Sequence, residues 1–394
     1  MDGPAPTQRI VRFSPPAIGE DEIREVVDTL ESEWLTTGPK TALFEQQFRE
    51  FVDAPAALAL NSCTAGLHLS LVALGIAAGD EVITSTLTFA STVNVIEHVG
   101  ARPVLVDVEP DTLNIDPRCV ERAITPRTKA IVAVHFSGHP ADLDALGVIA
   151  RRHGLALVED AAHAVDAAYH GRPIGSSANL TSFSFYATKN LTTAEGGMLT
   201  GDPELVDRAR ILSLHGMSRN AWNRYGAEGS WFYDVVTPGF KCNMTDVQAA
   251  LGLAQLARLE RLQLRRAEIF ARYNAAFESI AGLQTPMCRA DVKHAWHLYV
   301  LRLGDGVLQG GRDALIAALQ TRSICTSVHF IPVHMHTFYR DKYGYRPDDF
   351  PVALDSYLRM LSLPLSPALS DNDVTRVIES VTEVVACRTQ RRAG

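Results

Sequence analysis

Apolar residues recur along this chain in two alternating arrangements. Short apolar runs bounded by turn residues alternate with longer stretches in which apolar residues return at helical spacing. The short runs predict buried strands, and the longer stretches predict amphipathic helices. Strands separated by helices are typical of an α/β fold with a mostly parallel sheet that is covered on both faces. The predicted strands are Ala56–Asn61, Glu81–Ser85, Arg102–Val108, Ala130–His135, Leu155–Glu159, Ser182–Phe185 and Gly197–Thr200.

Helices are expected between these strands and before them. Residues 1–19 resemble an extended arm that is rich in Pro and Gly. The helical stretches that follow are Glu20–Ser32, Thr41–Phe51, Ser62–Leu74, Ala90–His98, Asp116–Ala123 and Leu143–His153. Because ligands bind at the carboxyl ends of the strands in such sheets, polar residues at those ends are the first candidates for a site.

The longest helical pattern, Thr245–Asn274, predicts a connection to a second domain. We expect a large domain over residues 1–275 and a smaller C-terminal α+β domain over residues 276–394. The smaller domain would contain strands near His297–Leu303 and Ser323–Phe330 and helices near Gly311–Thr321 and Asp371–Ala386.

Composition narrows the range of partners. The 394 residues carry a net charge of −8 without long blocks of like charge, which argues against nucleic acid or an anionic membrane surface as the main partner. No run reaches the ~20 apolar residues of a membrane span. The six cysteines are scattered singly, which predicts neither a disulfide framework nor a metal site. With an N-terminus that lacks the apolar core of a signal peptide, this favours reduced thiols in the cytoplasm.

The stretch Thr181–Gly197 carries the most specific chemistry. Lys189 lies just past a predicted strand end, among small hydroxyl residues and before Gly196 and Gly197. A lysine in such a place can form a Schiff base with an aldehyde, provided that burial or a nearby cation lowers its pKa. Ser184 can offer a hydroxyl to a phosphate. Taken alone, a lysine in this position is more often an ordinary loop lysine.

Four further features fall at strand ends. Thr64 and Ala65 lie where a helix begins, a position that attracts phosphate but also needs an ordinary cap. Asp160 ends an apolar strand, where its carboxylate can hold a cationic ring nitrogen or cap the next segment. His163 can pack beside a ring, and Phe89 can stack on one, although each alone is more often structural.

One ligand explains these features together. It has a phosphate for Thr64, Ala65 and Ser184, a flat ring for Phe89, and an aldehyde for Lys189. A ring nitrogen would pair with Asp160. Pyridoxal 5′-phosphate (PLP) has all of these parts, and its sites pair a Schiff-base lysine with a carboxylate at the pyridine nitrogen.

The sequence resembles the DegT-type nucleotide-sugar aminotransferases over roughly residues 10–390. The matching stretches are Gly79–Thr84, Ala123–Ala130, Val158–Ala164, Phe183–Gly197 and Thr245–Leu253. The resemblance implies PLP fold type I, which is the aspartate aminotransferase fold.

The resemblance also implies roles for single residues. It gives Lys189 and Asp160 as the catalytic pair, His163 beside the ring, Phe89 as the stacking aromatic, and Thr64, Ala65 and Ser184 as phosphate ligands. It further implies a homodimer whose active site lies at the subunit interface. In that dimer either Lys241 or Asn243 reaches the neighbour's cofactor.

The segments Thr237–Asp246 and Lys293–His297 are similar to a subgroup that aminates C4 of a nucleotide-linked 4-keto sugar. The resemblance implies L-glutamate as amino donor and a nucleotide-diphosphate keto sugar as acceptor. Candidates for binding the diphosphate are Arg219, Arg224 and Lys241, and His329 is favoured over His334 and His336 for the sugar pocket. A composition rich in Ala and Arg favours a bacterial sugar of secondary metabolism, with dTDP-4-keto-6-deoxyglucose as the acceptor.

Two alternatives remain open from the sequence. The first is a C3 aminotransferase that acts on a 3-keto sugar with the same machinery. The second is a regulator that has the PLP fold but no turnover, which Lys189 and Asp160 together disfavour.

Overall fold

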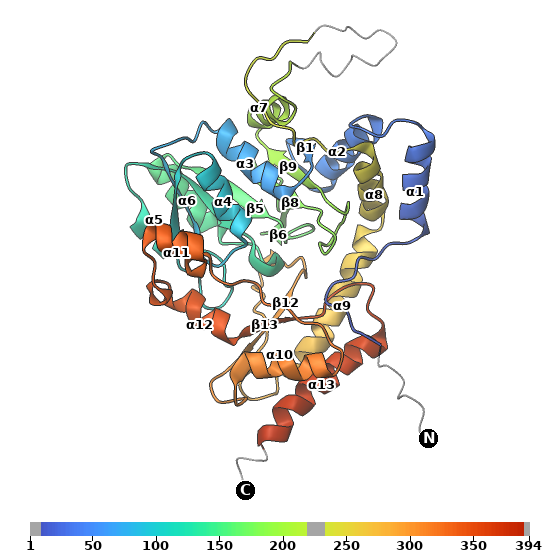
Figure 1. Cartoon of the computed structure of the whole chain (residues 1–394), viewed down its shortest axis with the longest axis vertical. Helices are drawn as coiled ribbons and strands as arrows, with labels where there is room; N and C mark the ends of the chain where they lie inside the picture. The colour runs from blue at the N-terminus through green and yellow to red at the C-terminus, as the bar shows by residue number, and fades with distance from the viewer. Residues whose placement is uncertain (1–8, 219–232, 390–394) are drawn as a thin grey trace.

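The computed structural model of the chain describes residues 9–218 and 233–389 (Figure 1). Its centre is a seven-stranded sheet with the order β1-β9-β8-β5-β4-β2-β3. The strands, in that order, are Ala56–Leu60, Gly197–Gly201, Leu180–Ser184, Ala156–Ala161, Thr128–Val134, Glu81–Ser85 and Arg102–Val106. Strands β8, β5, β4, β2 and β3 run parallel, whereas β9 is antiparallel to both of its neighbours. The mostly parallel sheet that the sequence predicts is therefore confirmed.

Helices cover both faces of this sheet because neighbouring strand residues face opposite ways. Val82 packs in one apolar cluster with residues of α3 (Cys63–Ala73) and α4 (Ala90–His98). Its neighbour Ile83 packs in another cluster, with residues of α5 (Pro117–Ala123) and α6 (Leu143–His153). Helix α7 (Pro203–Ser213) also packs against this sheet, on β1, and against α3.

The long helix expected over Thr245–Asn274 is two helices. They are α8 (Asp246–Ala257) and α9 (Leu259–Phe277), and they meet at Arg258, whose φ of −107° departs from helical values. The Arg258 guanidinium binds the buried Glu22 over 2.6 Å. Glu22 belongs to α1 (Glu20–Glu31), which packs on α8 together with α2 (Pro39–Phe51).

The C-terminal part contains a second, three-stranded sheet. It has the order β10 (Leu283–Gln284), β12 (Tyr299–Leu303) and β13 (Met360–Leu363). Helices α10 (Gly311–Thr321) and α13 (Asp371–Thr389) share an apolar cluster with this sheet and with α9. This cluster is distinct from those of the large sheet, and a further cluster joins Leu105 of β3 to Val300 of β12 and Met360 of β13 where the two parts meet. We propose the division near residues 275 and 276. Two shorter helices, α11 (Thr337–Tyr343) and α12 (Pro351–Arg359), precede β13.

The strand expected over Ser323–Phe330 does not form. Ile324 makes only an isolated parallel bridge with Val11 of the N-terminal arm, and Ser327 pairs singly with Ser362. The arm therefore packs against the C-terminal part of the chain. Among the described residues, no helix has the length and apolar composition that a membrane span requires.

Candidate active site

A cavity of about 470 Å³ lies beyond the carboxyl ends of β4, β5 and β8. Parallel strands place their carboxyl ends at one edge of a sheet, so side chains that are distant in sequence meet there. Most of the residues singled out from the sequence line this one cavity: Thr64, Phe89, Asp160, His163, Ser184, Lys189 and His329.

Lys189 reaches the cavity from the loop that follows β8. Desolvation there lowers the pKa of its amine to about 8, and the nearby Cys63 and Asp160 oppose this shift. An amine with this pKa is neutral in a substantial fraction of molecules near pH 8. It can then act as a nucleophile towards an aldehyde or take up a proton.

Asp160 is held at the end of β5 by donors on both carboxylate oxygens. Its Oδ2 accepts a hydrogen bond from Thr92 Oγ1 over 2.7 Å, and its Oδ1 accepts one from the Ala162 amide over 3.1 Å. Thr92 belongs to α4, so the strand and the helix fix the carboxylate together. A carboxylate fixed in this way can pair with a protonated ring nitrogen.

His163 is buried beside Asp160. Its Nδ1 accepts a hydrogen bond from the Ser137 amide over 3.3 Å. Its ring stacks on Phe330, with centroids 5.8 Å apart and planes 21° apart, and lies 4.4 Å from the ring of His297. Burial lowers the pKa of His163 well below its usual value, and Lys189 adds to this shift. The imidazole is therefore neutral.

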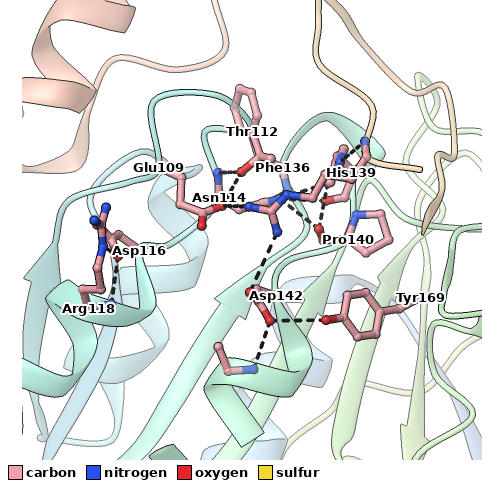
Figure 2. Close-up of polar contacts among 12 residues, drawn as sticks. Glu109, Thr112, Asn114, Asp116, Arg118, Phe136, His139, Pro140, Asp142 and Tyr169 are labelled. Carbon is pink, nitrogen blue, oxygen red and sulfur yellow. Dashed lines mark hydrogen bonds and ion pairs between the residues drawn. The ribbon is translucent and has the colours of Figure 1, made fainter. Parts of the chain in front are cut away.

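A network of polar contacts fixes the turn that supports His163 (Figure 2). The turn, η1 (Phe136–Gly138), follows β4. Asn114 Oδ1 accepts a hydrogen bond from the amide of its first residue over 2.8 Å. Asn114 Nδ2 donates to the carbonyls of His139 and Pro140, each over 3.1 Å. The turn is held on both sides, and its middle residue supplies the amide that binds His163.

The start of α3 provides a site for an anion. Ser62 Oγ caps this helix by accepting the Ala65 amide over 3.1 Å, and Ser62, Cys63 and Thr64 line the cavity. The amides of Cys63 and Thr64 have no partner within the helix because they lie in its first turn. Backbone amides at a helix N-terminus bind phosphate, and Ser184 adds a hydroxyl to the same cavity. Because Ser62 Oγ already accepts the Ala65 amide hydrogen, this amide contributes less to a phosphate site than the sequence predicts.

Phe89 lies at the N-cap of α4 and at the cavity. The residue is 61% exposed, and its ring contacts Phe330 with centroids 5.8 Å apart. A buried core position, the ordinary alternative for this phenylalanine, is therefore excluded. The exposed ring face is free to stack on a flat ligand.

These residues together fit PLP. The Lys189 amine, whose pKa is lowered, suits the aldehyde, and the Asp160 carboxylate, which accepts two hydrogen bonds, suits the ring nitrogen. The N-terminus of α3 at the same cavity suits the phosphate. Thr64, Phe89, Asp160, His163, Ser184 and Lys189 remain our proposed ligands and catalytic residues.

Lys241 and Asn243 do not line the cavity: Lys241 Nζ donates to Asn243 Oδ1, and Asn243 Nδ2 donates to Thr37 Oγ1 over 2.6 Å. Arg219 and Arg224 lie outside the described residues.

Of the candidate histidines in the C-terminal part, His329 lines the cavity, with Nδ1 2.8 Å from Ser362 Oγ. His334 does not, and it is buried between Thr86 Oγ1 and the Pro347 carbonyl. Neither His334 nor His336 is among the residues that line the cavity.

Several residues that line the cavity are not among those that the sequence predicts for the site. They are Phe13, Ser14, Cys63, Tyr186, His297 and Phe330. Ser14 Oγ lies 3.1 Å from the carbonyl of Thr188, next to Lys189, so the N-terminal arm forms part of the cavity wall. A lone aromatic or hydroxyl residue in an arm gives no sequence signal for such a position.

Known proteins resemble the chain over nearly its full length. Residues 16–382 match the DegT/DnrJ/EryC1/StrS aminotransferase family. The spore coat polysaccharide biosynthesis protein SpsC of Bacillus subtilis is 56% identical over 375 residues, which are 95% of this chain and 96% of SpsC. The putative sugar aminotransferase Spr1654 of Streptococcus pneumoniae has been solved in a PLP-form and a PMP-form. Its PLP-form has a TM-score of 0.90 at 38% identity and covers 96% of this chain and 99% of that one.

Proposed function

Because the chain belongs to the DegT/DnrJ/EryC1/StrS aminotransferase family, we propose that it transfers an amino group from L-glutamate to C4 of a nucleotide-linked 4-keto-6-deoxy sugar. Its family and the solved structures that it resembles show that the protein is a PLP-dependent sugar aminotransferase of fold type I. The observation that carries the proposal is the meeting of Lys189, Asp160 and the start of α3 in one cavity.

The chain's residues divide the work between binding and proton transfer. When bound, PLP supplies an aldehyde that reacts with amines and a ring that takes up electrons from the reacting carbon. The amides of Cys63 and Thr64 and the Ser184 hydroxyl bind its phosphate. Asp160 keeps the ring nitrogen protonated. Lys189, with a pKa of about 8, removes and returns protons near neutral pH as a general base and acid.

The choice of C4 rests on two segments of the sequence. The segments Thr237–Asp246 and Lys293–His297 resemble the subgroup that aminates C4. The name of SpsC supports a sugar that enters a polysaccharide, so a product for secondary metabolism is the less supported destination. We keep dTDP-4-keto-6-deoxyglucose as the first acceptor to test.

A homodimer is part of the proposal. Helix α1 exposes Ile23, Val27 and Leu30, at 59%, 42% and 53%, on one helical face. Exposed apolar faces of this kind mark protein interfaces. Lys241 and Asn243 do not line the cavity of their own subunit, which is required if one of them reaches the cofactor of the neighbouring subunit. The cytoplasm stays the predicted location.

An absorbance spectrum before and after addition of L-glutamate tests the proposed donor. A visible cofactor band that disappears when L-glutamate is added supports L-glutamate as the donor. A band that is unchanged by L-glutamate contradicts this assignment. Parallel assays with a 4-keto and a 3-keto nucleotide sugar then separate C4 from C3 amination. A protein that binds PLP but transfers no amine to either sugar would favour the regulator.

A further inference from the structure

His297 lines the cavity, yet the proposed function gives it no role. It lies just before β12, and its ring is beside that of His163, with centroids 4.4 Å apart. The residues around both rings determine which nitrogen of each carries hydrogen. The inference that follows rests on the proposed function, because it concerns the keto-sugar substrate.

Asn190, the residue after Lys189, can be oriented in only one way. Its Nδ2 donates to Gln263 Oε1 over 3.0 Å and to the Ala295 carbonyl over 2.5 Å. Gln263 Nε2 donates to the same Ala295 carbonyl over 2.9 Å, which fixes the Gln263 amide as well. Rotating the Asn190 amide by half a turn would place its oxygen against two other oxygens. Asn190 Oδ1 is therefore the atom that faces His297.

Asn190 Oδ1 lies 2.9 Å from His297 Nδ1. A carbonyl oxygen only accepts hydrogen bonds, so Nδ1 must carry the hydrogen. Burial lowers the pKa of His297 well below its usual value, and His163 and Lys189 add to this shift, so the ring is neutral. A neutral imidazole with hydrogen on Nδ1 has a bare lone pair on Nε2.

His163 is fixed in the opposite tautomer. Its Nδ1 accepts from the Ser137 amide, which can only donate, so the hydrogen of this neutral ring is on Nε2. The two rings lie side by side with planes 35° apart. An end-to-end hydrogen bond between their Nε2 atoms would hold the centroids farther apart. The pair therefore offers the cavity one donor, from His163, and one acceptor, from His297.

A bare imidazole lone pair interacts differently with the two substrates. It repels the carboxylates of L-glutamate and attracts a hydroxyl group. The amine of L-glutamate is its reacting group, and only the sugar carries hydroxyls. We propose that His297 Nε2 accepts a hydrogen bond from a ring hydroxyl of the keto sugar and so helps to determine sugar specificity.

Two substitutions separate the nitrogens of His297. In H297N the amide can still donate to Asn190 Oδ1, but no atom replaces Nε2. In H297Q the longer side chain can return an acceptor oxygen near the Nε2 position. We expect H297N to raise the KM for dTDP-4-keto-6-deoxyglucose about tenfold, the effect of one lost hydrogen bond, and H297Q to restore most of the loss. Calorimetry of the same sugar nucleotide with the apo-protein should show the same weakening.

Both variants should keep the absorbance change that L-glutamate causes, because the His297 lone pair offers L-glutamate no hydrogen bond to lose. H334N is the matched control, since His334 is also buried but lies outside the cavity. It should change neither KM nor the response to L-glutamate. Equal losses in the responses to L-glutamate and to the sugar would overturn the inference and assign His297 to the cofactor pocket.

Deoxy analogues identify the hydroxyl. Wild-type protein should bind the 2-deoxy or the 3-deoxy analogue of the keto sugar about tenfold more weakly, whereas H297N should not distinguish that analogue from the parent sugar. If wild-type protein does not aminate the keto sugar, the proposed function fails. If it does, and H297N has the wild-type KM, only the inference about His297 fails.

The tautomers can be observed without turnover. NMR of protein with ¹⁵N-labelled histidine should show His297 with hydrogen on Nδ1 and His163 with hydrogen on Nε2, both neutral from about pH 6 to pH 9. Hydrogen on His297 Nε2, or titration of His297 within that range, would overturn the inference.

Discussion

Thr92 donates a 2.7 Å hydrogen bond to Asp160, and both side chains are buried. Because a carboxylate only accepts, the hydroxyl hydrogen of Thr92 points to Asp160, and Thr88 then donates to Thr92 over 2.8 Å. This chain of hydroxyls stabilises the ionised carboxylate and fixes its orientation. Thr92 is thus a positioning residue that acts through Asp160.

The substitution T92V tests this relationship because valine keeps the shape and removes the donor. Loss of a hydrogen bond to a charged group costs about 1.5–3 kcal/mol, so we expect kcat to fall about tenfold to hundredfold. With Asp160 held less firmly against the ring nitrogen, the pH profile of the cofactor absorbance should shift from that of the wild type. T92S, which keeps the hydroxyl, should restore both properties. A wild-type pH profile in T92V would rule out this role.

The pKa of Lys189 predicts how the apo-protein captures PLP. Burial lowers this pKa to about 8, and only the neutral amine attacks the aldehyde. The neutral fraction increases as pH rises through 8, so the capture rate should increase between about pH 7 and pH 9 and then level off. The rate is measured from the growth of the visible band after mixing PLP with apo-protein. A midpoint near 10.5, the ordinary value for lysine, would show that the cavity does not desolvate Lys189.

The substitution K189A tests the catalytic role directly. Without the amine, the cofactor has no residue to attach to and no proton carrier, so turnover should fall at least about a hundredfold and the visible band should be lost. The exposed Lys129 on β4 supplies the control K129A, which should retain both. The assignment of Lys189 would be wrong if K189A kept near-normal turnover.

The sequence predicted the elements of the large sheet and the carboxyl ends at which Asp160 and Lys189 meet. That success has a local cause. Buried parallel strands are short apolar runs, and the residues that follow them share one edge of the sheet. Lys189 and Asp160 could therefore be placed together, because Lys189 follows β8 and Asp160 lies at the carboxyl end of β5.

The features that were missed depend on contacts between distant segments. The break at Arg258 coincides with its bond to Glu22, 236 residues away, which no helical periodicity reveals. Phe13 and His297 reach the cavity only because the arm and the C-terminal part pack there. The neighbours of Phe13 in sequence give no sign of it, and for His297 the one sign is the resemblance of Lys293–His297 to a subgroup, so packing decides these positions.

Gly197 packs closely against the anion site at the start of α3. A Cβ at Gly197 would lie 2.5 Å from the carbonyl carbon of Ser62 and 2.6 Å from the amide nitrogen of Cys63. Both are backbone atoms at the first turn of the helix, so they can move only if the phosphate site moves. Gly197 therefore allows β9 to pack directly against the amides that bind the anion.

We expect G197A to destabilise the protein by about 1–3 kcal/mol, the usual cost of overpacking, and to weaken PLP binding as well. Thermal unfolding of the apo-protein and titration with PLP measure the two effects. The control is G147A on α6, where the new Cβ meets only the flexible end of Arg151. Because alanine favours helices over glycine, G147A should be neutral or slightly stabilising. If G197A lost stability but bound PLP normally, Gly197 would support the fold alone, and the phosphate would not depend on the position of these amides.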